Sequence, residues 1–388
     1  MSPAVLSVTM GIFSIVTAEI LPIGLLTSIG DSFAVSDGTA GLMMTMPGFL
    51  AAVAAPVVTV ATARVDRRQL LRALMLLLTL ANFAAAAALG YWTVLLSRVL
   101  VGITIGGFWS VAAGLAERLV PPGSVPRATA VIFSAVPLGS VLGVPAGTFI
   151  GDVAGWRTAF VVLAVLSGLV LVALTVVVPP LPPVQVTDLG VLRAALGRTR
   201  IALLLTFLIV LAHFGTYTYV TPFLEQVPRL SSGNITVLLL VYGTAGVAGN
   251  FLAGTAVARY PRAAFGTSAA LLAGATLLLP LSGTSLVGAA ALLVVWGLAY
   301  GAVPVCSQTW FVKALPRTPE AASVLFTASF QATIGLGALA GGVVVDRTSP
   351  STVLLLGGLT ATLVIVVVAG TCPRGRLPIG GTRVPRSR

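Results

Sequence analysis

Twelve long apolar segments, separated by short charged or turn-forming clusters, constrain this chain more than any other feature of its sequence. A membrane-spanning helix needs ~20 apolar residues. Only 8% of the 388 residues are charged and 57% are hydrophobic, whereas a soluble domain carries ~25% charged residues. We therefore predict an all-α membrane protein. The expected spans are residues 4–29, 39–63, 70–89, 94–117, 128–151, 157–178, 201–224, 235–258, 264–281, 285–311, 322–345 and 352–371.

The loops between these spans are too short for a soluble catalytic or nucleotide-binding domain, since the longest, 179–200, has 22 residues. The sequence has no GxxxxGK[ST] nucleotide motif and no HExxH metal motif, and its single His and two Cys offer little for a metal cluster or a nucleophilic dyad. We expect no metal, no cofactor and no enzymatic activity. An intramembrane enzyme would need two converging catalytic side chains, and we identify no convincing pair.

Basic residues are divided unequally between the two sides of the membrane that these spans imply. Of the 22 Lys and Arg, 18 lie on the side of the amino terminus. By the positive-inside rule, this distribution predicts a multi-pass protein of the cell membrane with both termini in the cytoplasm. The net charge of +12 is thus a topology signal, and we expect no nucleic-acid partner. The three basic residues on the other side are Arg157, Arg229 and Arg347.

The two halves of the chain repeat each other at an offset of 194 to 195 residues. Six spans therefore repeat as six in the same orientation, an arrangement typical of transporters with a substrate site between the halves. We expect a bundle at 1–178, a cytoplasmic linker at 179–200, a second bundle at 201–371 and a basic tail at 372–388. The matching segments are GITIG (102–106) with GLAYG (297–301), RVDR (64–67) with RYPR (259–262), and GVPAGTFIGD (143–152) with GALAGGVVVD (337–346).

Four motifs resemble those of the major facilitator superfamily, in its twelve-span drug:proton antiporter branch and close to arabinose-efflux-type permeases. The resemblance covers the chain from the first span to the last. It implies two pseudo-symmetric six-helix bundles that work by alternating access, a central cavity lined by spans 1, 4, 7 and 10, and a monomer in the lipid bilayer. The motifs are ARVDRR (63–68), RVLVGITIGG (98–107), GSVLGVPAG (139–147) and TYVTPFLEQV (218–227).

Glu19 lies about midway along the first span, within IVTAEILPIG at 15–24. A charge at the bilayer centre costs ~3 kcal/mol or more, so this side chain needs a function or a partner. Desolvation favours the neutral carboxyl and a nearby cation favours the charged one, which suits a group that exchanges a proton for a substrate. We predict that Glu19 carries the proton and that Arg98 is its cation. A static ion pair between the two spans is the alternative.

His213 lies in the middle of the seventh span, and the offset of 194 residues makes it the repeat partner of Glu19. An unperturbed imidazole titrates close to neutral pH. We therefore predict His213 as a second proton-coupling residue. A single interhelical hydrogen bond is the alternative role for this side chain.

Aromatic and polar residues at helical spacing are expected on the walls of the cavity that the resemblance implies. Residues three or four apart share one face of a helix. Aromatic rings with few fixed charges suit a partly apolar organic solute, while interface packing or an aromatic belt at the membrane surface is the alternative. The predicted substrate contacts are Trp109, Tyr217, Trp296, Tyr300, Asn250 and Gln331.

The resemblance also implies residues that control access and packing. Asp66 matches the gate residue of the family and is expected to stabilise an outward-open state, with a solvated loop charge as the alternative. The predicted gate residues are Asp66, Arg67, Arg68 and Glu117. In span 5, small residues spaced by four permit close helix approach, and the resemblance implies that this stripe contacts the other half. The predicted antiporter motif comprises Gly139, Gly143, Pro145 and Gly147.

Taken together, these features predict a secondary transporter that exports a small organic compound, such as a drug, sugar or metabolite, in exchange for protons. Proton flux can drive such export without a nucleotide site, because moving one charge through 100 mV is worth ~2.3 kcal/mol. Uptake by proton symport is the alternative, since only the span 5 motif favours export.

Overall fold

The computed structural model describes residues 2–62, 64–112, 115–182, 195–316 and 318–370. These residues form helices joined by turns, and twelve helical segments are long and apolar enough to cross a membrane, which confirms the predicted fold. The helices are α1 (Pro3–Ile20), η1 (Leu21–Leu25), α2 (Leu26–Phe33), α3 (Asp37–Ala40), α4 (Leu42–Ala61), α5 (Arg67–Ala86), α6 (Tyr91–Ala112), α7 (Leu115–Leu119), η2 (Pro122–Ser124), α8 (Val125–Ala154), α9 (Trp156–Val177), α11 (Arg200–Tyr217), α12 (Val220–Gln226), α13 (Ser232–Arg259), α14 (Pro261–Ser282), α15 (Leu286–Ala314), α16 (Pro319–Arg347) and α17 (Pro350–Gly370).

The first and the seventh predicted spans are broken helices, and both of these breaks lie beside a proline. In the first span, α1 passes through the 3₁₀ turn η1, which contains Pro22, before it continues as α2. In the seventh, α11 ends at Tyr217 and α12 begins at Val220, two residues before Pro222. Proline lacks the N–H of a helical hydrogen bond and its ring displaces the carbonyl four residues earlier. Both breaks leave backbone groups available where the two halves meet.

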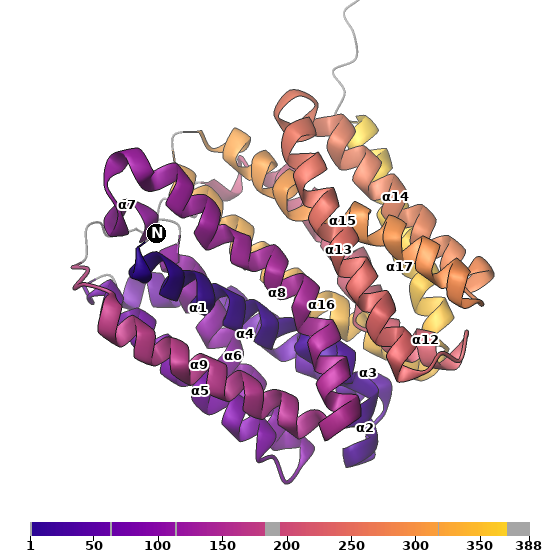
Figure 1. Ribbon diagram of the computed structural model, residues 1–388. Coiled ribbons are helices and arrows are strands. Elements are labelled where there is room, and N and C mark those ends of the chain that lie inside the picture. The colour runs from indigo at the N-terminus through magenta and orange to yellow at the C-terminus, as the bar shows by residue number, and fades with distance from the viewer. Residues whose placement is uncertain (1, 63, 113–114, 183–194, 317, 371–388) are drawn as a thin grey trace, which may run out of the picture.

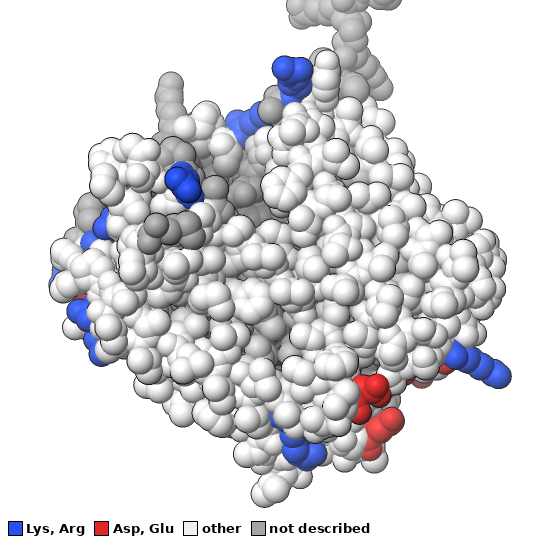
Figure 2. Space-filling view, viewed as in Figure 1, with Lys and Arg blue, Asp and Glu red and all other residues white. Residues whose placement is uncertain are grey.

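The two halves lie side by side and separate towards one end of the molecule (Figure 1). We call the end that carries Pro3 and Gly370 the terminal face, and the other end the opposite face. In Figure 1, α8 and α13 lie close at their opposite-face ends and diverge towards the terminal face. Figure 2 shows charged side chains near the ends of the molecule and none over the broad middle of this face, as a lipid-facing surface requires.

Repeated glycines explain the matching packing of the two halves. An added Cβ at Gly106 of α6 would lie 2.5 Å from the Ala51 carbonyl oxygen of α4. At its repeat partner Gly301 of α15, the added Cβ would meet the Gly246 backbone of α13 even more closely. Small residues let helix backbones approach in a membrane, where the hydrophobic effect does not drive helices together. The GITIG and GLAYG segments therefore build the same helix crossing twice.

The glycine stripe of α8 packs within its own half, so the expectation that it contacts the other half is wrong. Gly139 faces Val16, Gly143 faces Thr17 and Ile20, and Gly147 faces Leu21. Spacing by four indicates a close helix neighbour but does not say which one.

The other face of α8 contacts the second half close to Pro145. Because Pro145 has no N–H, the Val141 carbonyl four residues earlier loses its helical partner. The Val141 backbone lies against Gly243 of α13, where an added Cβ would be 2.8 Å from the Val141 Cα. Pro145 thus marks the crossing of α8 with the other half, beside the glycine stripe.

Several expectations concern parts of the chain outside the described residues. These parts are most of the linker (183–194), Arg317, and the basic tail with Cys372. Cys306, by contrast, is described and is a buried free thiol in α15.

Candidate functional site

Glu19 lies at the meeting point of the two halves, near the end of α1 where the helix gives way to η1. Its side chain is 8% exposed. The Gln331 side chain of α16 approaches the carboxyl closely enough for a hydrogen bond, and Arg98 of α6 interacts with it electrostatically. The Tyr300 hydroxyl of α15 also lies within electrostatic range. One carboxyl group therefore interacts with side chains of both halves of the molecule.

The Arg98 guanidinium holds the backbone of two neighbouring helices. Its Nε donates to the Met43 carbonyl oxygen at 3.1 Å, and its Nη2 donates to the Glu19 carbonyl oxygen at 3.1 Å. The side chain is fully buried and its Nη1 has no partner among the described residues. Arg98 thus fixes the backbone at Glu19 and keeps one N–H group of its guanidinium available near the carboxyl.

His213 of α11 lies at the centre of an aromatic cluster from three helices. Its ring stacks on Tyr300 with centroids 3.4 Å apart and planes 7° apart, and it stacks on Tyr217 at 5.1 Å. Tyr242 of α13 continues the stack at 4.5 Å from Tyr217, and Trp296 meets His213 edge-on at 5.8 Å. The structure therefore gathers three predicted site residues around His213, and Tyr300 connects this cluster to Glu19.

A hydrogen bond fixes which nitrogen of His213 carries its proton. Trp296 Nε1 lies 3.1 Å from His213 Nδ1. Because an indole N–H can only donate, Nδ1 is the acceptor, and the proton of a neutral ring lies on Nε2, 3.5 Å from the Tyr242 hydroxyl. A second proton on Nδ1 would break the bond from Trp296. This geometry suits a positioning role for His213 within the cluster.

Several buried polar atoms near the meeting point of the halves have no partner among the described residues. Most buried polar side-chain atoms in proteins are hydrogen-bonded, so a group of exceptions points to a ligand or to water. The atoms are Gln331 Oε1, Arg98 Nη1, Thr17 Oγ1 and Ser307 Oγ. Within the part of the chain that the structure describes, no cluster of His, Cys, Asp or Glu could hold a metal ion.

Two predicted substrate contacts lie outside this group. The Trp109 ring packs on Phe133 of α8 at 6.1 Å, in the terminal-face part of the N-terminal half. Asn250 is half-buried on α13, next to Gly249, which faces Leu298 of α15. Tyr242, in turn, is a site residue that we did not predict, because its place in the stack depends on the packing of α13 against α15 rather than on its own sequence surroundings.

The opposite face is closed by hydrogen bonds between the halves. Asp346 at the end of α16 accepts from the Ser36 hydroxyl at 2.7 Å and from the Gly38 amide at 2.8 Å. It thereby caps the short helix α3 of the other half. Thr27 donates to Glu225 at 3.1 Å, and Thr221 donates to the Ile23 carbonyl oxygen at 3.0 Å. We did not predict these residues from the sequence, because the two members of each hydrogen-bonded pair are about half of the chain or more apart in sequence.

Asp66, Arg67 and Arg68 form their hydrogen bonds with the N-terminal half and with the start of the linker in this conformation. Asp66 accepts from the Arg68 amide at 2.7 Å and from the Leu181 amide at 2.9 Å. Arg67 donates to the Thr62 carbonyl oxygen and Arg68 to that of Thr175. Glu117 is exposed at the terminal face. The halves are thus joined by hydrogen bonds at the opposite face and lie apart at the terminal face (Figure 1).

Glu225 makes the closed face sensitive to pH. Burial raises the pKa of Glu225, the Thr27 hydroxyl lowers it in part, and the carboxylates of Asp37 and Asp31 raise it further. Acidic side chains gather on this part of the surface in Figure 2, over α2 and α3. Because the pKa is raised when the face is closed, protonation of Glu225 favours closure, and this contribution is lost as pH rises through the raised pKa.

We therefore expect acid to increase the closed population at the opposite face. The distance between spin labels at Ser28 and Ser231, two exposed positions on that face, reports this population. Glu225→Gln resembles the protonated form and should remain closed across the pH range that opens the wild type. Equal pH dependence in the variant and the wild type would remove Glu225 from this role.

Comparisons with known proteins agree with this architecture. A family model described as Major Facilitator Superfamily matches residues 8–326. The purine ribonucleoside efflux pump NepI of Escherichia coli is 31% identical over 374 residues, and the match covers 94% of each chain. The pump of the same name from Shigella sonnei gives the same identity and coverage.

Solved structures with low sequence identity share the fold. A bacterial homolog of the human lysosomal transporter Spinster, in an inward-facing and unoccupied conformation, has a TM-score of 0.71 at 18% identity over 94% of each chain. The human organic anion transporter TETRAN has a TM-score of 0.68 at 18% identity, covering 94% of this chain and 99% of that one.

Proposed function

The chain belongs to the major facilitator superfamily and is a membrane transporter, and from this premise we propose that it exports a purine-nucleoside-like solute in exchange for protons bound at Glu19. The single observation that carries the proposal is the burial of this one carboxyl between the two halves, where it interacts electrostatically with Arg98 of one half and lies beside the Gln331 side chain of the other. The halves must move relative to each other during transport. A proton on Glu19 is therefore linked to their arrangement.

The other acidic residues of the chain are poor candidates for the same role. The sequence has ten Asp and Glu, and Glu19 is the one in the middle of a predicted span, whereas the rest lie in loops or near span ends. An ionisable residue at membrane depth is expensive to keep, and it commonly marks a proton or substrate pathway. Exchange follows if a bound solute replaces the proton as the group that satisfies Glu19 and Gln331.

A flat heterocycle with both donors and acceptors fits the surroundings of Glu19 best. Tyr300, whose ring stacks on His213, interacts electrostatically with the carboxyl, Gln331 Oε1 offers an acceptor and Arg98 Nη1 a donor. Stacking on aromatic rings combined with hydrogen bonds to ring edges is how proteins recognise nucleobases. The relatives at 31% identity are named as purine ribonucleoside efflux pumps, which supports the same solute class here.

The proposed direction is export, which the names of the 31% identical relatives, efflux pumps, support. With both termini in the cytoplasm, the terminal face is the cytoplasmic one, and α8 and α13 lie farther apart at that face than at the opposite face (Figure 1). Solute enters from the cytoplasm, the halves close behind it, and protons from outside reset the carrier. Acid outside would also favour closure of the opposite face through Glu225.

Transport into proteoliposomes tests this function. Radiolabelled guanosine, a purine ribonucleoside, should accumulate in vesicles with an acidic lumen when the terminal face is outside, and accumulation should collapse when a protonophore is added. Accumulation driven by a proton gradient of the reverse sign would identify a symporter. Binding or transport of guanosine that is the same with and without the proton gradient would contradict proton coupling.

Gln331 should determine how tightly the solute binds. Gln331→Met keeps the length of the side chain but removes the amide, so we expect the Kd for guanosine to rise about tenfold to a hundredfold, the loss of one or two buried hydrogen bonds. Equilibrium binding to purified protein measures this. Gln69→Met is the matched control, because Gln69 is exposed in α5 near the terminal face. An unchanged Kd in the Gln331 variant would remove this residue from the binding site.

A further inference from the structure

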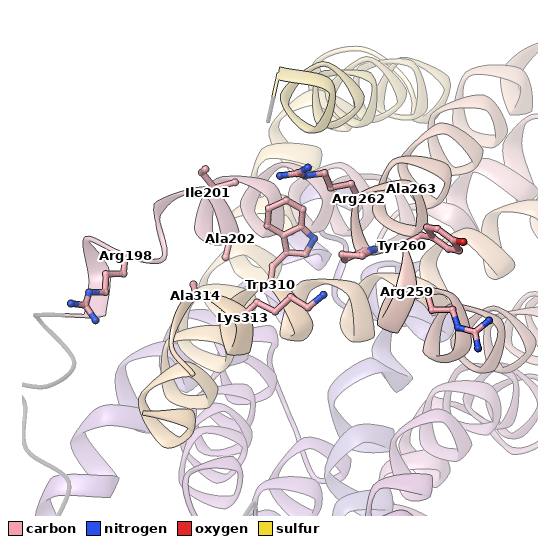
Figure 3. A pocket seen from close by; sticks show the side chains of 11 residues that line it. Arg198, Ile201, Ala202, Arg259, Tyr260, Arg262, Ala263, Trp310, Lys313 and Ala314 are labelled. Carbon is pink, nitrogen blue, oxygen red and sulfur yellow. The ribbon is translucent and has the colours of Figure 1, made fainter. Parts of the chain in front are cut away.

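A basic pocket lies at the terminal face of the C-terminal half, separate from Glu19 and its neighbours. The cavity of about 580 Å³ lies among the start of α11, the junction of α13 with α14, and the end of α15. Four basic side chains line it, and no acidic side chain among the described residues does. Figure 3 shows the Trp310 ring among them. The lining residues that matter here are Arg198, Tyr260, Arg259, Arg262, Trp310 and Lys313.

At the equivalent place in the N-terminal half, Asp66 and the start of the linker supply hydrogen-bond acceptors. The offset of 195 residues aligns Asp66 with Pro261 and Arg118 with Lys313. Asp66 accepts hydrogen bonds from the amide in the first turn of α5 and from the Leu181 amide. Arg118 donates to the Pro182 carbonyl oxygen. The Asp66 carboxylate thus caps the start of α5, and the Pro182 carbonyl oxygen accepts a hydrogen bond from Arg118.

The C-terminal half lacks that carboxylate. Pro261 stands in its place, and no side chain caps the start of α14. The first amides of a helix have no intrahelical acceptors, and the helix start carries a partial positive charge. Arg262 in the first turn and Lys313 across the pocket add formal positive charge to the same cavity. The place equivalent to Asp66 in the C-terminal half therefore has hydrogen-bond donors and positive charge but no carboxylate.

The Trp310 indole adds a further donor inside the cavity. Its Nε1 is buried and has no partner among the described residues. An indole nitrogen donates one hydrogen bond and accepts none. A ligand that satisfies this nitrogen together with Arg262 and Lys313 must therefore supply acceptor oxygens and negative charge.

We propose that this pocket binds a phosphate group, most directly that of an anionic lipid headgroup in the adjoining leaflet. Phosphate oxygens form strong charge-assisted hydrogen bonds with Arg and Lys, and basic pockets between transmembrane helices bind acidic headgroups. Ile201 and Tyr260 border the pocket with exposed fractions of 49% and 67%, and these surfaces suit the glycerol and acyl parts of a lipid. The last 18 residues contain five Arg and no acidic residue, so the chain's own tail lacks the charge to fill the site.

The test compares two charge-matched double variants of the full-length protein. Arg262→Gln with Lys313→Gln removes two charges from the pocket, whereas Arg64→Gln with Arg127→Gln removes two exposed charges of the same face outside it. Native mass spectrometry then counts the phosphatidylglycerol and phosphatidylcholine molecules that each protein retains. We expect retention of phosphatidylglycerol to fall about tenfold in the pocket variant alone, as expected for the loss of charge-assisted hydrogen bonds.

A second arm uses inorganic phosphate and distinguishes the source of the group. Sodium phosphate is compared with sodium chloride at equal ionic strength, and the shift in melting temperature is measured in detergent. Loss of phosphatidylglycerol without a phosphate-specific shift identifies a lipid headgroup. A phosphate-specific shift that the pocket variant loses, with lipid retention unchanged, identifies a soluble phosphate compound. Equal lipid retention and equal shifts in the pocket variant and the wild type, or an equal loss in the control variant, would overturn the proposal.

Discussion

The Glu19→Gln variant should lose accumulation of guanosine against its gradient while it still equilibrates the solute down its gradient. Gln keeps the size of the side chain and its hydrogen bonding to Gln331 but cannot carry a proton. A proton moving through 100 mV supplies ~2.3 kcal/mol, which corresponds to a concentration ratio of roughly 50. We expect this ratio to fall to about one in the variant. Steady-state uptake into proteoliposomes at a fixed proton gradient measures it.

The control for this variant removes a different carboxylate. Asp152 is exposed at the opposite-face end of α8, so Asp152→Asn should accumulate guanosine like the wild type. Reconstituted amount and monodispersity must match among the three proteins. Normal accumulation by Glu19→Gln would show that the proton is carried elsewhere.

Gly38→Ala should be almost as damaging, through the closed face rather than the proton site. A Cβ at Gly38 would lie 2.3 Å from the Gly342 carbonyl oxygen and 2.5 Å from Asp346 Oδ2, both on α16 of the other half. The Gly342 backbone cannot move away from this Cβ unless the two halves separate. Alanine otherwise favours a helix by up to ~1 kcal/mol over glycine, so α3 itself should not suffer. We expect the closed state to be lost and transport to fall at least about tenfold.

Distances between labels at Ser28 and Ser231 should show this loss directly, as an open population that persists in acid. Gly233→Ala is the matched control, because Gly233 is the second residue of α13 on the same face and an added Cβ there would meet nothing within 4 Å. Wild-type transport and closure in Gly38→Ala would mean that the contact between α3 and α16 is not needed for the cycle.

The fold could be predicted because a membrane leaves the chain few choices. A span of ~20 apolar residues must satisfy its own backbone hydrogen bonds, so length and composition decide that it is a helix. The internal repeat of the sequence also corresponds to equivalent helix contacts in the two halves. Gly147 faces Leu21 and Gly341 faces Gly215, which keeps the offset of 194 residues that pairs Glu19 with His213.

The contacts between the halves could not be predicted, because local sequence does not encode which helices face each other. The spacing of Gly139, Gly143 and Gly147 indicates close packing, but α1 rather than the other half receives it. Asp346 was visible only as the repeat partner of Asp152, and its bond to Ser36 spans 310 residues. Glu19 and Arg98 were found because charge inside an apolar span is conspicuous in a sequence.

The most direct test of the account is proton release from the purified protein when it binds solute. In a weakly buffered detergent solution near neutral pH, adding guanosine to the wild type should acidify the medium, and adding it to Glu19→Gln should leave the pH unchanged although guanosine still binds. Release of the same number of protons by both proteins, or binding to the wild type without any release, would contradict the exchange of a proton for solute at Glu19.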